Sequence, residues 1–203
     1  MITTIIFDFG DVFINLDKTG ASIKALEFFN ITEFSPEMMA CNEAYETGKI
    51  STDAFLNFYQ KLAPNATKNQ LITIWNALLR DFPPHRLAFL QKLATQNNYQ
   101  LILLSNTNEL HIDWIKKNVS FYETFQAQFH QFYLSHIIEL RKPNADIYKF
   151  VLDSNRLQPE NCLFIDDTKE NIEAAHALGI HTWHLNPEKH DVVNLFTAKK
   201  DLF

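Results

Sequence analysis

Polar side chains suited to phosphate chemistry follow three short apolar runs in this 203-residue sequence, at 5–7, 101–104 and 162–165. They are Asp8, Ser105-Asn106 and Asp166-Asp167, and Lys142 lies in a loop before the last pair. In open parallel sheets, ligands bind beyond the carboxyl ends of the strands. If the three runs are neighbouring strands, these side chains meet at one place. The pattern therefore predicts a single site of carboxylates, small polar groups and a lysine.

The carboxylates of Asp8, Asp166 and Asp167 would bring about three negative charges together, and their repulsion would favour protonation unless a cation compensates. A hard divalent cation with oxygen ligands does so, and Mg²⁺ suits a site of few carboxylates, waters and a substrate phosphate. Two alternatives involve no metal. The pair Asp166-Asp167 could cap a helix, and Asp8 could form a turn through its side chain.

A carboxylate held by a metal next to a phosphate is a competent nucleophile, which gives Asp8 a catalytic role. Gly10 permits a tight, unusual backbone course that turns its carbonyl toward the metal. Lys142 offers a point charge for both Asp8 and the phosphate, although a lone lysine beside Arg141 is also consistent with an ordinary surface residue.

Ser105 supplies a hydroxyl, and the turn 105–107 is expected to open a helix whose backbone N–H groups bind phosphate oxygens. A capping role for Ser105 is compatible with this. His111 lies four residues beyond Thr107, within reach of the site, and a structural role is the alternative.

Strand and helix patterns alternate, which predicts a three-layer, Rossmann-like parallel α/β sheet. Further strands are expected within 129–135 and at 180–183, and helices at about 85–96 and 146–155 and from 168 to 178. From 18 to 82 every pattern is helical, which is far more than a crossover needs. We expect this block to be a helical subdomain inserted after the first strand, with 1–17 and 83–203 forming the core.

Composition restricts the possible functions. The net charge of −6 and the lack of a dense basic patch argue against a nucleic-acid partner. Four glycines cannot build a P-loop or a dinucleotide fingerprint, and no nucleophile elbow or zinc motif is present. Cys41 and Cys162 form no metal-type pair, and no signal peptide or membrane span is visible, so we expect a cytoplasmic protein that does not bind membranes.

Four ordered segments resemble the motifs of the haloacid dehalogenase superfamily. They are Ile5-Ile6-Phe7-Asp8-Phe9-Gly10-Asp11-Val12, Leu104-Ser105-Asn106-Thr107, Arg141-Lys142-Pro143, and Phe164-Ile165-Asp166-Asp167 with Asn171. The block 18–82 resembles the small helical cap of that superfamily. The segments 105–111 and 141–143 look closest to a bacterial α-D-glucose-1-phosphate phosphatase group.

The resemblance implies a Mg²⁺-dependent phosphatase that acts through an aspartyl-phosphate on a small phosphorylated metabolite, such as a hexose 1-phosphate. By this resemblance, Asp8 is the nucleophile and a metal ligand, and the Gly10 carbonyl is a second metal ligand beside the phosphate. Asp167 is the third metal ligand, and Asp166 and Asn171 support the metal side. Ser105 and Asn106 bind the phosphate, and Lys142 neutralises Asp8 and the phosphoryl group. Oligomeric state is not readable from the sequence.

One departure from the superfamily pattern concerns the proton donor. Most phosphatases of the superfamily carry a second Asp two residues after the nucleophile, where this sequence has Gly10. General acid–base catalysis is worth about 10²–10⁴-fold, so poor leaving groups should suffer most. Asp11 is an alternative donor. Two other functions stay open: a non-catalytic phosphate-binding protein, which the missing acid favours, and a haloacid dehalogenase, which the Asp166-Asp167 pair argues against.

Overall fold

The computed structural model describes residues 1–203, and five parallel strands form its single sheet. The strands are β1 (Thr4–Phe7), β2 (Gln100–Ser105), β3 (Gln131–Leu134), β4 (Cys162–Asp166) and β5 (His181–His184), in the order β3-β2-β1-β4-β5. In the central ladder Phe7 pairs with Leu103 on one side and Ile165 on the other. Every predicted strand is present.

Helices cover both faces of the sheet, because β1 to β4 are apolar on both sides. One apolar cluster contains Ile5 and Phe7 and is covered by α5 (Pro84–Gln96), α6 (Glu109–Asn118), α7 (Tyr122–Gln126) and α11 (Leu195–Ala198). A second cluster contains Ile6 and is covered by α9 (Ala145–Asn155) and α10 (Lys169–His176). Helix α8 (Ser135–Ile138) follows β3 directly. The predicted three-layer α/β fold is confirmed.

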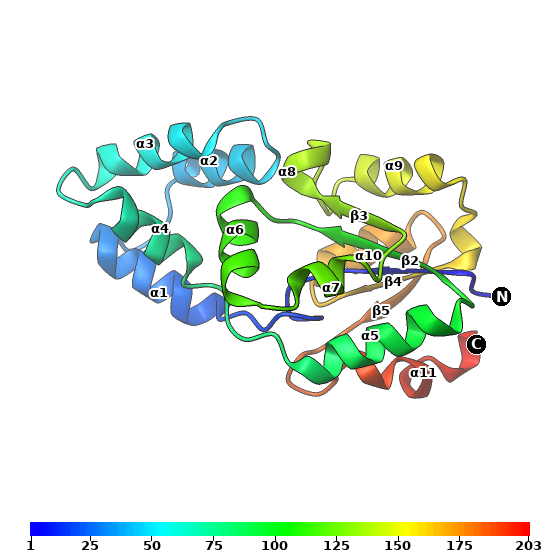
Figure 1. The fold of residues 1–203 in the computed structure, drawn as a ribbon. Coiled ribbons are helices and arrows are strands. Elements are labelled where there is room, and N and C mark those ends of the chain that lie inside the picture. The colour runs from blue at the N-terminus through cyan, green and yellow to red at the C-terminus, as the bar shows by residue number, and fades with distance from the viewer.

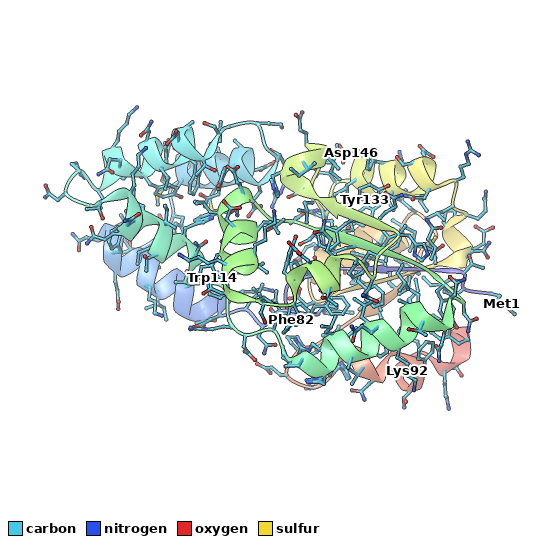
Figure 2. The ribbon with its side chains drawn as sticks, viewed as in Figure 1. Met1, Phe82, Lys92, Trp114, Tyr133 and Asp146 are labelled. Atoms are coloured by element: carbon cyan, nitrogen blue, oxygen red, sulfur yellow. The ribbon has the colours of Figure 1, made fainter.

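Aromatic rings fill much of the first cluster. Phe82, labelled in Figure 2, packs edge-on against Phe125 with 4.9 Å between ring centroids. Phe125 also lies 5.0 Å from the rings of both Phe9 and Phe13, which follow the first strand. The segment just after β1 is therefore anchored in the core by two phenylalanines on either side of the turn at 10–12.

The chain between β1 and α5 forms four helices: α1 (Lys18–Phe29), α2 (Pro36–Glu46), α3 (Thr52–Leu62) and α4 (Lys68–Asn76). Ser35 and Ser51 cap α2 and α3, accepting bonds from backbone N–H groups at 3.3 and 3.2 Å. Figure 1 shows α1 to α4 gathered beyond the end of the sheet at which the strands terminate. No helix in the structure combines the length and the apolar character that a membrane span requires.

The helices α1 to α4 also contact helices that lie beside the sheet, among them α6 and α8. Leu110 of α6 belongs to their apolar cluster, and its N–H donates to the Tyr45 hydroxyl at 3.1 Å. At the turn after α2, Gly48 has φ +66°, and a Cβ there would lie 2.2 Å from the carbonyl oxygen of His136 in α8. Nearby, the buried Ser135 hydroxyl lies 2.6 Å from the Glu46 carbonyl oxygen and 2.9 Å from that of Thr107.

Candidate active site

The carboxyl ends of β1 and β4 bring three acids together. One oxygen each from Asp8, Asp166 and Asp167 lies within 4.8 Å of the others. The register explains this, because Phe7 pairs with Ile165 and the acids directly follow these residues. Two adjacent parallel strands that end at the same level therefore place their next side chains on one spot.

Lys142 is a buried member of this cluster, with 1% of its surface exposed. Its Nζ donates to Asp8 Oδ1 and to Asp166 Oδ2, both at 2.7 Å. Burial alone would lower the pKa of Lys142, but the two carboxylates raise it above its ordinary value, so the ammonium stays charged. The surface-lysine alternative is thereby excluded. Its neighbour Arg141 points elsewhere and pairs with Glu46 of α2 at 3.2 Å.

The cluster has more negative than positive charge. Burial raises the pKa of Asp8 to about 7, with Lys142 opposing and Asp166 adding to the shift. Burial also raises the pKa of Asp167, although Lys18 opposes it. Burial and the neighbouring carboxylates thus disfavour the charged forms, and a hard dication with oxygen ligands would offset this. The donor set of this structure therefore fits Mg²⁺.

The two adjacent acids have different surroundings. Asp166 is fully buried, and besides Lys142 it accepts bonds from Thr168 N–H at 2.8 Å and from the Asn171 amide at 3.0 Å. Asp167 is half-buried and receives the ammonium of Lys18 from α1. Asp166 holds the residue that precedes α10, whereas Thr168 itself makes no side-chain capping bond. Asp166 thus holds its neighbours in place, and Asp167 has the oxygen that can reach a ligand.

Asn106 binds the backbone of the lysine loop. Its Oδ1 accepts from Lys142 N–H at 2.9 Å, and its Nδ2 donates to the Lys142 carbonyl at 2.8 Å. The side-chain amide is therefore engaged on both ends. Ser105 is buried at the end of β2, and its hydroxyl has only a weak contact of 3.5 Å with the Asn106 carbonyl. This hydroxyl is free for a ligand.

The helix expected to open at 105–107 begins later than predicted. Its first residue is Glu109, and Asn108 caps it by accepting from His111 N–H at 3.1 Å. Thr107 lies outside the helix, and its N–H donates to the Ser135 hydroxyl at 2.9 Å. The N–H groups at the start of α6 are thus partly used within the protein, and the loop before it faces the acids.

The unusual backbone expected at Gly10 occurs one residue later. Asp11 has φ +54°, in the left-handed region, whereas Gly10 does not. A Cβ at position 10 would lie 2.7 Å from Leu16 Cδ1, the end of a side chain that would have to shift. The Asp11 carboxylate accepts from Leu16 N–H at 2.9 Å and pairs with Lys18 at 3.0 Å. Asp11 is therefore occupied in positioning Lys18.

Lys18 is the charged residue at the site that sequence reasoning missed, because no local pattern marks a lysine 149 positions from its partner Asp167. His111, in contrast, has the structural role that was the alternative for it. It is buried, its Nδ1 lies 3.1 Å from the Asn108 amide, and its Nε2 lies 3.2 Å from the Trp75 carbonyl. The carbonyl needs a donor, so the ring is the neutral Nε2–H tautomer.

Known proteins resemble this chain in both sequence and structure. The model of the haloacid dehalogenase-like hydrolases matches residues 5–184. The chain belongs to this family. Among curated proteins, it is 25% identical to a D-ribitol-5-phosphate phosphatase of Bacteroides thetaiotaomicron, over 90% of this chain and 91% of that protein.

Two solved structures of the family are also similar. A haloacid dehalogenase family enzyme from Bacteroides thetaiotaomicron, in complex with magnesium and inorganic phosphate, shares 32% identity at a TM-score of 0.84, covering 97% of this chain and 100% of that one. A predicted hydrolase from Porphyromonas gingivalis shares 25% identity at a TM-score of 0.83, covering 98% and 97%. These matches confirm the predicted superfamily and its Rossmann-like fold. They also confirm the enzyme class, a hydrolase with a phosphatase among its relatives. The glucose-1-phosphate phosphatase group is not among these matches.

Proposed function

We propose that this chain is a Mg²⁺-dependent phosphomonoesterase that acts on a small phosphorylated metabolite. The observation that carries the proposal is the buried cluster in which Lys142 bridges Asp8 and Asp166 at 2.7 Å, with Asp167 beside them. The family membership and the magnesium and phosphate bound by a relative support it.

In the proposed reaction, an Asp8 carboxylate oxygen attacks the phosphorus while the bond to the leaving oxygen breaks, which gives an aspartyl-phosphate and an alcohol. Water then cleaves the acyl phosphate and restores the Asp8 carboxylate. Lys142 favours the ionised form of Asp8 and draws charge from the phosphoryl oxygens, and the Ser105 hydroxyl donates to one of them. Asn106 acts by holding the Lys142 backbone, in addition to any contact with phosphate.

Bound at Asp8, Asp167 and the Gly10 carbonyl, Mg²⁺ would neutralise the phosphoryl oxygens and the carboxylates. Asp166 would support this arrangement from its buried position, and Asn171 would hold Asp166. Since Gly10 replaces the usual second acid and Asp11 is engaged with Lys18, we propose that the leaving oxygen takes its proton from water. The enzyme should therefore favour esters of the more acidic alcohols.

We further propose that 18–82, the helices α1 to α4, form a cap over a core of 1–17 and 83–203, in a cytoplasmic protein. The cap would exclude water from the site. The resemblance suggests a hexose 1-phosphate as one candidate substrate, and the relative suggests ribitol 5-phosphate as another.

Replacement of the nucleophile tests the reaction. Asp8→Asn should abolish hydrolysis of an aryl phosphate in Mg²⁺, and chelation should abolish it in the wild type until Mg²⁺ is restored. The matched control is Asp146→Asn at the exposed start of α9, which should retain full activity. Undiminished turnover by Asp8→Asn would refute the proposal. Magnesium binding without turnover of any phosphate would favour the non-catalytic alternative, and chelator-resistant activity on a haloacid would favour a dehalogenase.

A further inference from the structure

A cavity of about 230 Å³ lies among α1, α3, α4 and α6, with the end of α2 at its side. Its walls are mainly apolar and include the rings of Phe29, Phe55 and Trp75. The space exists because α1 presents small side chains to it, namely Ala21, Ser22 and Ala25. An apolar cavity of about 150 Å³ can take up benzene, so this one has room for a ring with a substituent.

The cavity lies next to the acid cluster, because Lys18 belongs both to the cavity lining and to the ion pairs of the cluster. Lys18 lines the cavity, and its ammonium pairs with Asp11 at 3.0 Å and also contacts Asp167. Glu46 lines the cavity from α2 and pairs with Arg141, the residue before Lys142. The part of a substrate beyond its phosphate therefore has this cavity as a neighbouring space.

Few polar groups in the cavity are free to bind a ligand. Both ring nitrogens of His111 are engaged with Asn108 and the Trp75 carbonyl. Asn42 uses its oxygen to accept from the Tyr59 hydroxyl at 2.6 Å, which leaves its amide N–H groups. The Ser22 hydroxyl is also free, as is one oxygen of Glu46, since the second oxygen faces Arg141. The Lys18 ammonium keeps one N–H beyond its two ion pairs, and the Tyr59 hydroxyl can still accept a bond.

The small number of free polar groups limits how many hydroxyls the leaving group can place in the cavity. A hydroxyl that loses water without finding a partner weakens binding by about tenfold. An open-chain polyol would place several hydroxyls against walls that are mainly apolar, where only these few groups could bind them. A flat apolar body would instead contact the aromatic walls, and one or two polar substituents would find these partners.

We propose, on the basis of the function proposed above, that the substrate is a phosphomonoester whose leaving group has a ring-sized apolar body with one or two hydrogen-bonding substituents, bound in this cavity. Ala25 sets the size of the cavity and thereby the specificity. The preferred substrate is thus chemically distinct from the polyol phosphate of the curated relative.

The test compares benzyl phosphate with ribitol 5-phosphate and glucose 1-phosphate on the full chain in Mg²⁺. The first two are both esters of primary alcohols, so their chemical steps are alike. We expect kcat/KM to be at least about tenfold higher for benzyl phosphate than for ribitol 5-phosphate, which corresponds to satisfying one further group. A preference for ribitol 5-phosphate would overturn the proposal, and this comparison needs no variant. Glucose 1-phosphate has a more acidic leaving hydroxyl, so only its KM is compared, and a KM below that of benzyl phosphate would also overturn the proposal.

Two substitutions on α1 then locate the preference. Ala25→Phe fills the cavity and should lower the ratio of kcat/KM for benzyl phosphate over acetyl phosphate at least tenfold, mainly through KM. The matched control is Ile23→Phe, at a residue that is 51% exposed on the same helix, and it should leave the ratio unchanged. Equal effects of the two variants, with melting temperatures close to the wild type, would contradict the proposal.

Acetyl phosphate separates this inference from the proposed function. Its leaving group is too small to fill the cavity, so its hydrolysis reports on the cluster around Asp8. If no ester at all is hydrolysed, the proposed function fails. Calorimetric titration of wild-type protein with benzyl phosphate and ribitol 5-phosphate then still tests the cavity, and equal or reversed affinities would overturn the inference.

Discussion

His111 should make the stability of the protein depend on pH in a predictable direction. Its ring stacks on Trp75 with 5.4 Å between centroids and joins α4 to α6. Burial lowers the pKa of His111 from its ordinary 6.5 to about 4, although the bond to the Trp75 carbonyl opposes the shift. Between these two pH values the unfolded chain binds a proton that the folded protein does not. Stability must therefore fall as the pH is lowered through this range.

The size of the effect follows from the shift. Lowering the pKa by about 2.5 costs about 3.4 kcal/mol in the free energy of unfolding once the ring is fully protonated. About 2 kcal/mol of this is already lost at pH 5. This loss is a large part of the free energy of unfolding of a typical protein, which is about 5–15 kcal/mol. Asp8 acts in the opposite direction, because its raised pKa favours the folded state at low pH. A comparison with a variant is therefore needed to isolate His111.

The measurement is urea unfolding of the wild type and of His111→Gln at pH 8 and pH 5. Glutamine keeps an amide near the two partners but does not titrate, so the wild type should lose about 2 kcal/mol more than the variant between these pH values. Contributions from all other groups cancel in the difference. If the difference between the two proteins stays constant to within about 0.5 kcal/mol, the neutral, buried state of His111 is refuted.

Three further substitutions have definite expected outcomes. Gly48→Ala should destabilise the protein by more than about 1 kcal/mol in urea unfolding, because a positive φ and the His136 carbonyl both oppose a Cβ, whereas Gly179→Ala, where a Cβ at φ +84° would make only an ordinary contact of 3.6 Å with Pro159, should show the strain alone. Lys142→Met should abolish phosphatase activity and cost about 3–5 kcal/mol, since two buried carboxylates lose their partner; unchanged unfolding would contradict the bridge. Arg86→Leu should cost about 2–4 kcal/mol, because this buried side chain donates to a backbone carbonyl and to a carboxylate, and an effect under 0.5 kcal/mol would show that these bonds contribute little.

The features that the sequence predicted well are those encoded by local patterns. An apolar run followed directly by Asp8, or by the pair Asp166-Asp167, marks both a buried strand and the end at which it stops. Parallel pairing then gathers these ends without further information. The helical block 18–82 was equally predictable, since caps such as Ser35 and Ser51 and helical periodicity lie within a few residues of each other.

The features that the sequence could not give depend on partners far along the chain. The burial of Lys142 follows from the amide of Asn106, 36 positions away, which holds its backbone. The loop before α6 is held by Ser135, 28 positions from Thr107. The left-handed backbone at Asp11 depends on the turn that buries the residues around it. Helix α8 and the short turns near the C-terminus contain too few residues to show a period.

The hydroxyl of Ser135 has a single hydrogen but two carbonyl acceptors, at 2.6 Å in Glu46 and at 2.9 Å in Thr107. It can donate to only one of them at a time. The hydrogen can pass from one carbonyl to the other without displacement of any heavy atom, and the Ser135 oxygen accepts from the Thr107 N–H in both cases. The junction between the end of α2 and the loop after β2 therefore has two hydrogen-bonding arrangements within a single backbone conformation.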